Sequence, residues 1–234
     1  MKHVPRRFVP KFVYGLLLLV AGGCRHQVRE GERENSFRPF LGDRVGGAPL
    51  SDFLVRRTAL LLVGAVPEKV EKKSDGWDIR LESATDGRLQ VGLGSAIPLS
   101  KNGYFLTAAH NLSSPPFTVA ILKNGGVEFA EAKVVWSGHA EIPEEDFAIV
   151  QARLHPGEIF EWEDSDAPTP GMAVVSMSGP HGRCGGSVLE ISRYSNPRIP
   201  CAVLSVTHDL PLLKGDSGGP VVGRDGRLVG MNVL

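Results

Sequence analysis

Cysteine, charge of one sign and long hydrophobic runs are all scarce in this chain of 234 residues. Three cysteines are too few for a disulfide-stapled scaffold, and none has the Cys-x-x-Cys or Cys/His spacing of a zinc site. Lysine plus arginine and aspartate plus glutamate both number 26, so the formal net charge is zero. This balance removes the main electrostatic argument for a nucleic-acid partner. We therefore expect no metal, no cofactor and no nucleic acid.

The remaining composition is that of a globular protein. Hydrophobic residues make up 42% and charged residues 22% of the chain, which excludes a disordered or fibrous protein. The 28 glycines and 17 prolines favour many turns and short strands over long helices.

The first 23 residues have the pattern of a secretory signal peptide. Basic residues and no acidic ones occur in Met1–Lys11, and residues Phe12–Gly23 are apolar or small. This apolar run is shorter than the about 20 residues that a membrane-spanning helix needs. We therefore expect an export signal rather than a membrane span.

Small residues stand directly before Cys24, an arrangement that resembles the lipobox of bacterial lipoproteins. The resemblance implies that the thiol of Cys24 receives a diacylglycerol and that Cys24 becomes the mature N-terminus. It departs from the usual pattern at Ala21, where the family prefers leucine. Arg25 in place of aspartate implies no inner-membrane retention, so we expect a lipid anchor at the outer membrane, on the periplasmic side. The alternative is an ordinary cleaved signal with an incidental cysteine.

A charged, Gly- and Pro-containing segment without hydrophobic period follows, and it is expected to be a mobile linker. Its residues Phe37, Phe40 and Leu41 offer the alternative of local docking. The expected organisation is a signal peptide over residues 1–23, a linker over 24–50 and a folded domain over 51–234.

Short apolar runs separated by turn signals fill the folded part and predict about eleven strands, hence an all-β sandwich or barrel. Asn124-Gly125-Gly126 and Asp225-Gly226 predict hairpin turns. Residues Thr58–Val66 are expected to form a strand, with part of a helix begun at Ser51 as the alternative. The only helix expected inside the domain is a single turn after His110. The other strands are predicted at 77–81, 89–99, 104–107, 117–123, 127–136, 147–152, 172–177, 186–192, 201–206, 220–223 and 227–233.

Three motifs carry the chemistry, and they occur in the order His, Asp, Ser. They are Thr107-Ala108-Ala109-His110, Asp146-Phe147-Ala148-Ile149-Val150 and Gly215-Asp216-Ser217-Gly218-Gly219-Pro220. A serine hydroxyl needs a neighbouring base, for which imidazole has a suitable pKa. The imidazole in turn needs a carboxylate on its second nitrogen. Glu144 and Glu145 are alternatives to Asp146 for that role. The glycines permit a tight turn in which two backbone N–H groups point at one oxyanion.

Together these motifs resemble the trypsin-like (chymotrypsin-fold) serine peptidases of the bacterial HtrA/Deg kind, over about Leu89–Leu234. The resemblance implies two antiparallel six-stranded β-barrels with the active site between them. It implies a serine endopeptidase with His110, Asp146 and Ser217 as its triad, the N–H groups of Gly215 and Ser217 as its oxyanion hole, and proteins or peptides as substrates.

Three departures from the family are visible. The chain ends at Leu234, before the family's last barrel strand, so we expect a second barrel that is truncated at its C-terminus, with a rearranged barrel or another segment in the gap as the alternatives. Asp216 lacks the new N-terminal amine that digestive members supply and must find another cation or solvent. Pro211, at the expected base of the specificity pocket, bears no carboxylate, which favours apolar or small side chains over Arg or Lys. The alternative function is therefore a catalytically impaired chymotrypsin-fold binding lipoprotein.

Cysteine and histidine residues outside the motifs complete the expectations. Cys184 and Cys201 are expected to pair in an exported protein, closing a loop of about 17 residues worth on the order of 3 kcal/mol, with two free buried thiols as the alternative. The other histidines, His139, His155, His181 and His208, are expected on the surface or in loops. For His208 the alternative is a place facing the specificity pocket.

Overall fold

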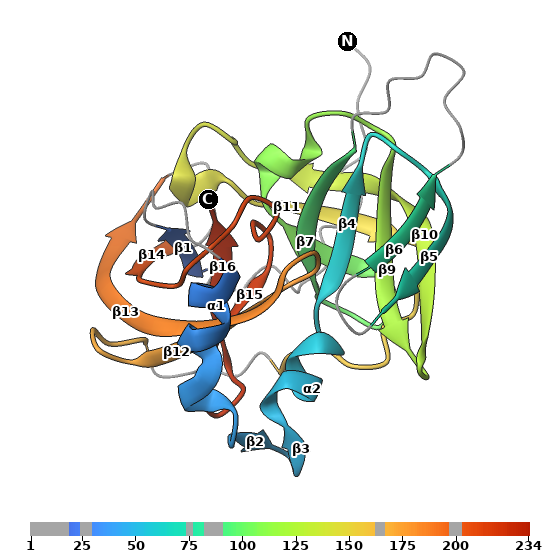
Figure 1. The fold of residues 1–234 in the computed structure, drawn as a ribbon. Helices are drawn as coiled ribbons and strands as arrows, with labels where there is room; N and C mark the ends of the chain where they lie inside the picture. Colours follow the sequence, from blue (N-terminus) through green and yellow to red (C-terminus); the bar gives the residue numbers. More distant parts are fainter. Residues whose placement is uncertain (1–18, 24–29, 74–76, 82–90, 162–166, 197–202) are drawn as a thin grey trace.

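Two six-stranded barrels form the body of the protein (Figure 1). The computed structural model describes residues 19–23, 30–73, 77–81, 91–161, 167–196 and 203–234. The predicted all-β, chymotrypsin-like fold is confirmed, and several strand predictions match to the residue, including those at 104–107 and 117–123.

The first barrel is closed in the order β10-β11-β8-β7-β4-β9. Its interior is filled by apolar side chains such as Leu61, Phe105 and Val150, none of which is exposed. The predicted Asn124-Gly125 turn joins β9 to β10. The strands are β4 (Ala59–Val63), β7 (Gly92–Pro98), β8 (Tyr104–Thr107), β9 (Phe117–Lys123), β10 (Gly126–Ser137) and β11 (Ala148–Ala152).

The second barrel is closed in the order β1-β14-β13-β12-β15-β16. Five of its strands come from the C-terminal third of the chain and were predicted, with bounds that shift by a few residues. The strands are β1 (Leu19–Gly23), β12 (Ala173–Ser178), β13 (Gly182–Tyr194), β14 (Val203–His208), β15 (Pro220–Gly223) and β16 (Leu228–Val233).

The sixth strand, β1, closes the second barrel, which agrees with the alternative that another segment fills the gap and corrects the expectation of a truncated, wholly antiparallel barrel. Residues Leu19–Gly23, expected to belong to a signal peptide, lie between β14 and β16 and pair parallel with both. Unpaired strand edges carry rows of free N–H and C=O groups, and any extended segment that reaches them gains hydrogen bonds. The gap between β14 and β16 is thus closed by a segment from the N-terminal part of the chain.

The segment expected to be a linker is structured from residue 30 onward. It contains α1 (Glu30–Phe37) and η2 (Arg38–Phe40), followed by the small β2–β3 ladder (Arg44–Val45, Ala48–Pro49). The expectation of a mobile linker is wrong for these residues because Phe37 and Phe40, 2% and 5% exposed, are buried in an apolar cluster to which both barrels and α2 contribute. The alternative of local docking holds for both.

Short elements complete the described chain. The helix α2 (Leu50–Val55) precedes the strand β4. A helix near Ser51 and a strand within residues 58–66, considered as alternatives from the sequence, are therefore both present. β5 (Pro67–Lys72), which was not predicted, pairs with the predicted β6 (Trp77–Leu81). The predicted helical turn at His110 is η3 (Ala109–Leu112), and a second turn, η4 (Pro143–Glu145), was not predicted. Among the residues described, no helix is long and apolar enough to cross a membrane.

Cys184 is a free thiol and is fully buried, contrary to the expected disulfide. It lies on β13 and packs inside the barrel against Val174, Val188 and Leu204. Burial raises the pKa of its thiol to about 12. Its expected partner, Cys201, lies outside the described residues, as does Cys24.

Candidate active site

His110 and Asp146 meet through two contacts at one end of the first barrel. The Nδ1 atom of His110 is 2.5 Å from Oδ2 of Asp146, and the backbone N–H of His110 donates to Oδ1 at 2.8 Å. The Asp146 side chain is 4% exposed, whereas that of His110 is 32% exposed. A buried carboxylate therefore orients a half-exposed imidazole whose other nitrogen, Nε2, is directed away from the acid.

The neighbouring acids have other partners. Glu145 accepts a hydrogen bond from the hydroxyl of Tyr194 at 2.7 Å, and it also accepts one from Asn196. Glu145 thus joins the first barrel to the end of β13. Among the three acids considered from the sequence, Asp146 is the one in contact with His110.

Ser217 is attached to the first barrel through its backbone. Its carbonyl accepts hydrogen bonds from Nδ2 of Asn111 at 3.0 Å and from the N–H of Ser95 at 2.9 Å. Asn111 is the residue after His110, so this contact places the serine beside the histidine. Within the described part of the chain, Oγ of Ser217 and Nε2 of His110 do not form a hydrogen bond. Such bonds are often long in unliganded enzymes and tighten with substrate.

The loop around Ser217 depends on a close approach to β7. Gly218 has φ +87°, and a Cβ there would lie 2.0 Å from the carbonyl oxygen of Ser95. The hydroxyl of Ser95 donates to the carbonyl of Gly215 at 3.0 Å. In the described residues, the N–H groups of Gly215 and Ser217 donate to no protein acceptor, as an oxyanion hole requires.

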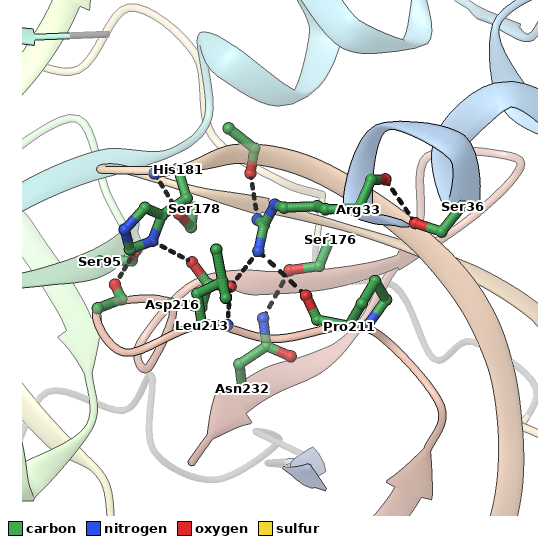
Figure 2. Close-up of polar contacts among 12 residues, drawn as sticks. Arg33, Ser36, Ser95, Ser176, Ser178, His181, Pro211, Leu213, Asp216 and Asn232 are labelled. Carbon is green, nitrogen blue, oxygen red and sulfur yellow. Dashed lines mark hydrogen bonds and ion pairs between the residues drawn. The ribbon is translucent and has the colours of Figure 1, made fainter. Parts of the chain in front are cut away.

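Asp216, between these two N–H groups, finds a cation within the chain (Figure 2). Its carboxylate forms a buried ion pair with Arg33 of α1 and lies 3.0 Å from Nδ1 of His181. The N–H of Leu213 donates to the same carboxylate at 2.8 Å. Burial opposes ionisation, but the His181 contact, the charge of Arg33 and this N–H together hold the pKa of Asp216 below its usual value.

His208 is fully buried at the end of β14, which corrects the expectation of a surface or loop position. Its Nδ1 accepts a hydrogen bond from the N–H of Leu210 at 3.2 Å. Burial lowers its pKa to about 4, so the ring is neutral at pH 7. Pro211, expected at the base of the specificity pocket, uses its carbonyl to accept a hydrogen bond from Arg33 at 3.3 Å.

Four residues of this region were not predicted: Arg33, Ser95, Asn111 and His181. No local motif marks them, since each acts through a partner far away in the sequence. The sequence indicated that Asp216 needs a cation or solvent, but it did not indicate which residue supplies the cation. In the described ranges, no group of three or more His, Cys, Asp or Glu side chains has the arrangement of a metal site.

Comparison with known proteins agrees with this geometry. The trypsin-like peptidase domain family matches residues 94–231, which include all three motifs. The chain therefore belongs to the trypsin-like peptidases.

Two relatives are proteases of the Deg group. The chain is 28% identical over 142 residues to a probable periplasmic serine endoprotease DegP-like of Marinomonas sp. (strain MWYL1), which covers 60% of this chain and 29% of that protein. It is 28% identical over 153 residues to the serine endoprotease DegS of Haemophilus influenzae, covering 63% and 43%. The chain thus spans less than half the length of either relative.

A solved structure supports the fold. The MamO protease domain from Magnetospirillum magneticum matches with a TM-score of 0.52 and 20% identity, covering 77% of this chain and 85% of that domain. A similarity at this level of identity shows the fold alone.

Proposed function

We propose that this chain is a serine endopeptidase that hydrolyses peptide bonds in proteins of the bacterial cell envelope. Ser217 attacks the scissile carbonyl, and His110 takes the serine proton and then passes it to the leaving amine. Asp146 holds the tautomer of His110 and stabilises the imidazolium. The N–H groups of Gly215 and Ser217 hold the negative oxygen of the tetrahedral intermediate. The acyl-enzyme that results is hydrolysed by water through the same groups.

The observation that carries this proposal is the double contact between His110 and Asp146. One carboxylate binds both the ring and the backbone of the histidine, so the ring has little freedom to rotate away. The neighbouring Asn111 binds the carbonyl of Ser217. The family membership supports the same assignment.

The test is replacement of Ser217 by alanine. The wild-type chain should react with a fluorophosphonate probe and hydrolyse casein, and Ser217→Ala should do neither. Ser113→Ala, at an exposed serine just after η3, is the matched control and should keep both activities. Unchanged labelling of Ser217→Ala would refute the assignment.

A second candidate is a binding lipoprotein that keeps the fold without turnover. One observation favours it: a relative that is 29% identical over 147 residues, covering 56% of this chain and 21% of that protein, is a probable membrane transporter protein, MamO, of Paramagnetospirillum magneticum. A folded, monodisperse wild-type sample that does not react with the fluorophosphonate probe would decide for this candidate.

Attachment to the outer membrane through a lipid on Cys24 is also part of the proposal. It is supported by the basic and apolar N-terminal pattern that ends in small residues before Cys24. Cleavage there would remove β1 from the second barrel. Mass spectrometry of the protein from a bacterial envelope tests this: a diacylated N-terminal Cys24 supports the anchor, and an intact Leu19–Gly23 segment overturns it.

A further inference from the structure

The helix α1 is fastened to β13 by close packing. A Cβ at Gly185 would lie 2.3 Å from the ring of Phe40 and 2.8 Å from the carbonyl oxygen of Ser36, so glycine is what lets the segment approach the strand. The N–H of Gly185 donates to the hydroxyl of Ser36 at 3.2 Å. The guanidinium of Arg183 covers the ring of Phe37, 4.8 Å from its centroid. The position of α1 on the barrel is therefore well defined.

From this helix, Arg33 extends to the loop that carries Ser217 (Figure 2). Its Nη2 donates to the carbonyl of Gly182 at 2.7 Å, and its Nη1 binds both the carbonyl of Pro211 and the carboxylate of Asp216. The side chains of Arg33 and Asp216 are 4% and 0% exposed. One guanidinium thus joins the start of β13 to the loop that precedes the nucleophile.

Arg33 supplies the permanent charge at this position. A guanidinium remains protonated at every pH at which proteins are folded. The second side-chain partner, His181, is 34% exposed and is a cation only when it is protonated. Without Arg33, the carboxylate of Asp216 would be an ion in a fully buried position, which is strongly unfavourable.

Relief of such a buried charge would move the residues on which catalysis depends. Asp216 follows Gly215 and precedes Ser217, so a rotation that brings its carboxylate to water also reorients the N–H groups of both neighbours. The hydrogen bond from Leu213 to the carboxylate would be lost in the same movement. A loop in that state has no assembled oxyanion hole.

We propose that Arg33 is a positioning residue for the oxyanion loop, and that its buried ion pair with Asp216 couples the docking of α1 on β13 to the reactivity of Ser217. The proposal rests on the proposed peptidase function. In this proposal the N-terminal segment supplies the cation that Asp216 needs, which the sequence alone did not identify. Arg33 acts through Asp216 and touches no reacting atom.

The experiment compares five forms of the full chain: wild type, Arg33→Met, Arg33→Lys, Gly185→Ala and the control Arg193→Met. Arg193→Met removes an exposed charge from the same strand, β13, away from the contacts described for α1. Each form is first shown to be folded by circular dichroism. The readouts are the rate of fluorophosphonate labelling at Ser217, kcat and KM for a peptide substrate, and hydrogen exchange of the peptide that contains residues 212–219.

Arg33→Met should lower the labelling rate and kcat by about 100-fold, the effect of losing an oxyanion donor, with little change in KM. Arg33→Lys should recover part of the rate because it restores a charge. Gly185→Ala should act in the same direction as Arg33→Met, since it displaces α1 while keeping both charges. Arg193→Met should stay within about twofold of wild type, because Arg193 is exposed and takes no part in the contacts described for α1 or Asp216. Exchange in peptide 212–219 should become faster in Arg33→Met and Gly185→Ala alone.

Failure of this proposal and failure of the peptidase function give different results. A folded Arg33→Met protein with wild-type labelling and wild-type exchange overturns the role of Arg33. A wild-type chain that does not label overturns the peptidase function instead. The exchange measurement still decides the role of Arg33 in that case, because it reports the order of the loop without any turnover.

Discussion

Replacement of Ser95 by alanine tests how the two barrels are joined behind the nucleophile. The hydroxyl of Ser95 donates to the carbonyl of Gly215 at 3.0 Å and accepts from the N–H of Gly179 at 2.9 Å. Ser95 is fully buried, so water does not replace the lost partner. A buried backbone group left without a partner costs about 1–3 kcal/mol. With two such groups, we expect the free energy of unfolding to fall by about 2–6 kcal/mol.

Urea unfolding followed by circular dichroism measures this change. Ser100→Ala is the matched control, because the hydroxyl of Ser100 accepts a single hydrogen bond in an exposed turn, and the expected loss is within about 0.5 kcal/mol. Ser95→Ala should also slow fluorophosphonate labelling, since the carbonyl of Gly215 is no longer held. A loss of stability as small as that of Ser100→Ala would show that Ser95 does not link the barrels and would refute the reasoning.

Two further predictions concern buried titratable groups. Unfolded His208 binds a proton below about pH 6.5, but the buried ring stays neutral until about pH 4, so the wild-type free energy of unfolding should fall by about 3 kcal/mol more than that of His208→Gln between pH 7 and pH 4 in urea titrations. Equal losses in the two proteins would contradict this. Cys184, with its thiol pKa raised to about 12 and no exposed surface, should resist iodoacetamide at pH 8 in the native protein and react after unfolding in urea, as judged by peptide mass spectrometry. Rapid alkylation of the native protein would show that the strand carrying Cys184 opens readily.

Much of the fold could be predicted from the pattern of apolar runs and turn motifs. Alternation of apolar and polar residues, together with turns such as Asn124-Gly125, is local information, and it located nearly all of the strands of the two barrels. The strand β5 escaped prediction because its segment, Pro67–Lys72, is mostly charged and has few apolar positions to mark it.

The N-terminal third shows what local patterns leave undecided. Residues Leu19–Gly23 have the composition of a signal peptide, but a run of apolar and small residues also makes an acceptable strand where two edges are open. The charged helix α1 has little hydrophobic periodicity, and it is held by the burial of two aromatic rings and one ion pair. Neither partner surface can be inferred from the segment itself.

The sequence alone identifies the candidate residues His110, Asp146 and Ser217, their order and the glycines around the serine. It can do so because each motif specifies its own turn or strand end. Packing between distant segments determines the remaining contacts of the site. It brings His110 to Asp146 and Ser217 to Asn111, and it makes Arg33 the cation for Asp216. Such pairings depend on how two barrels and a helix close around one another, and no stretch of neighbouring residues contains that information.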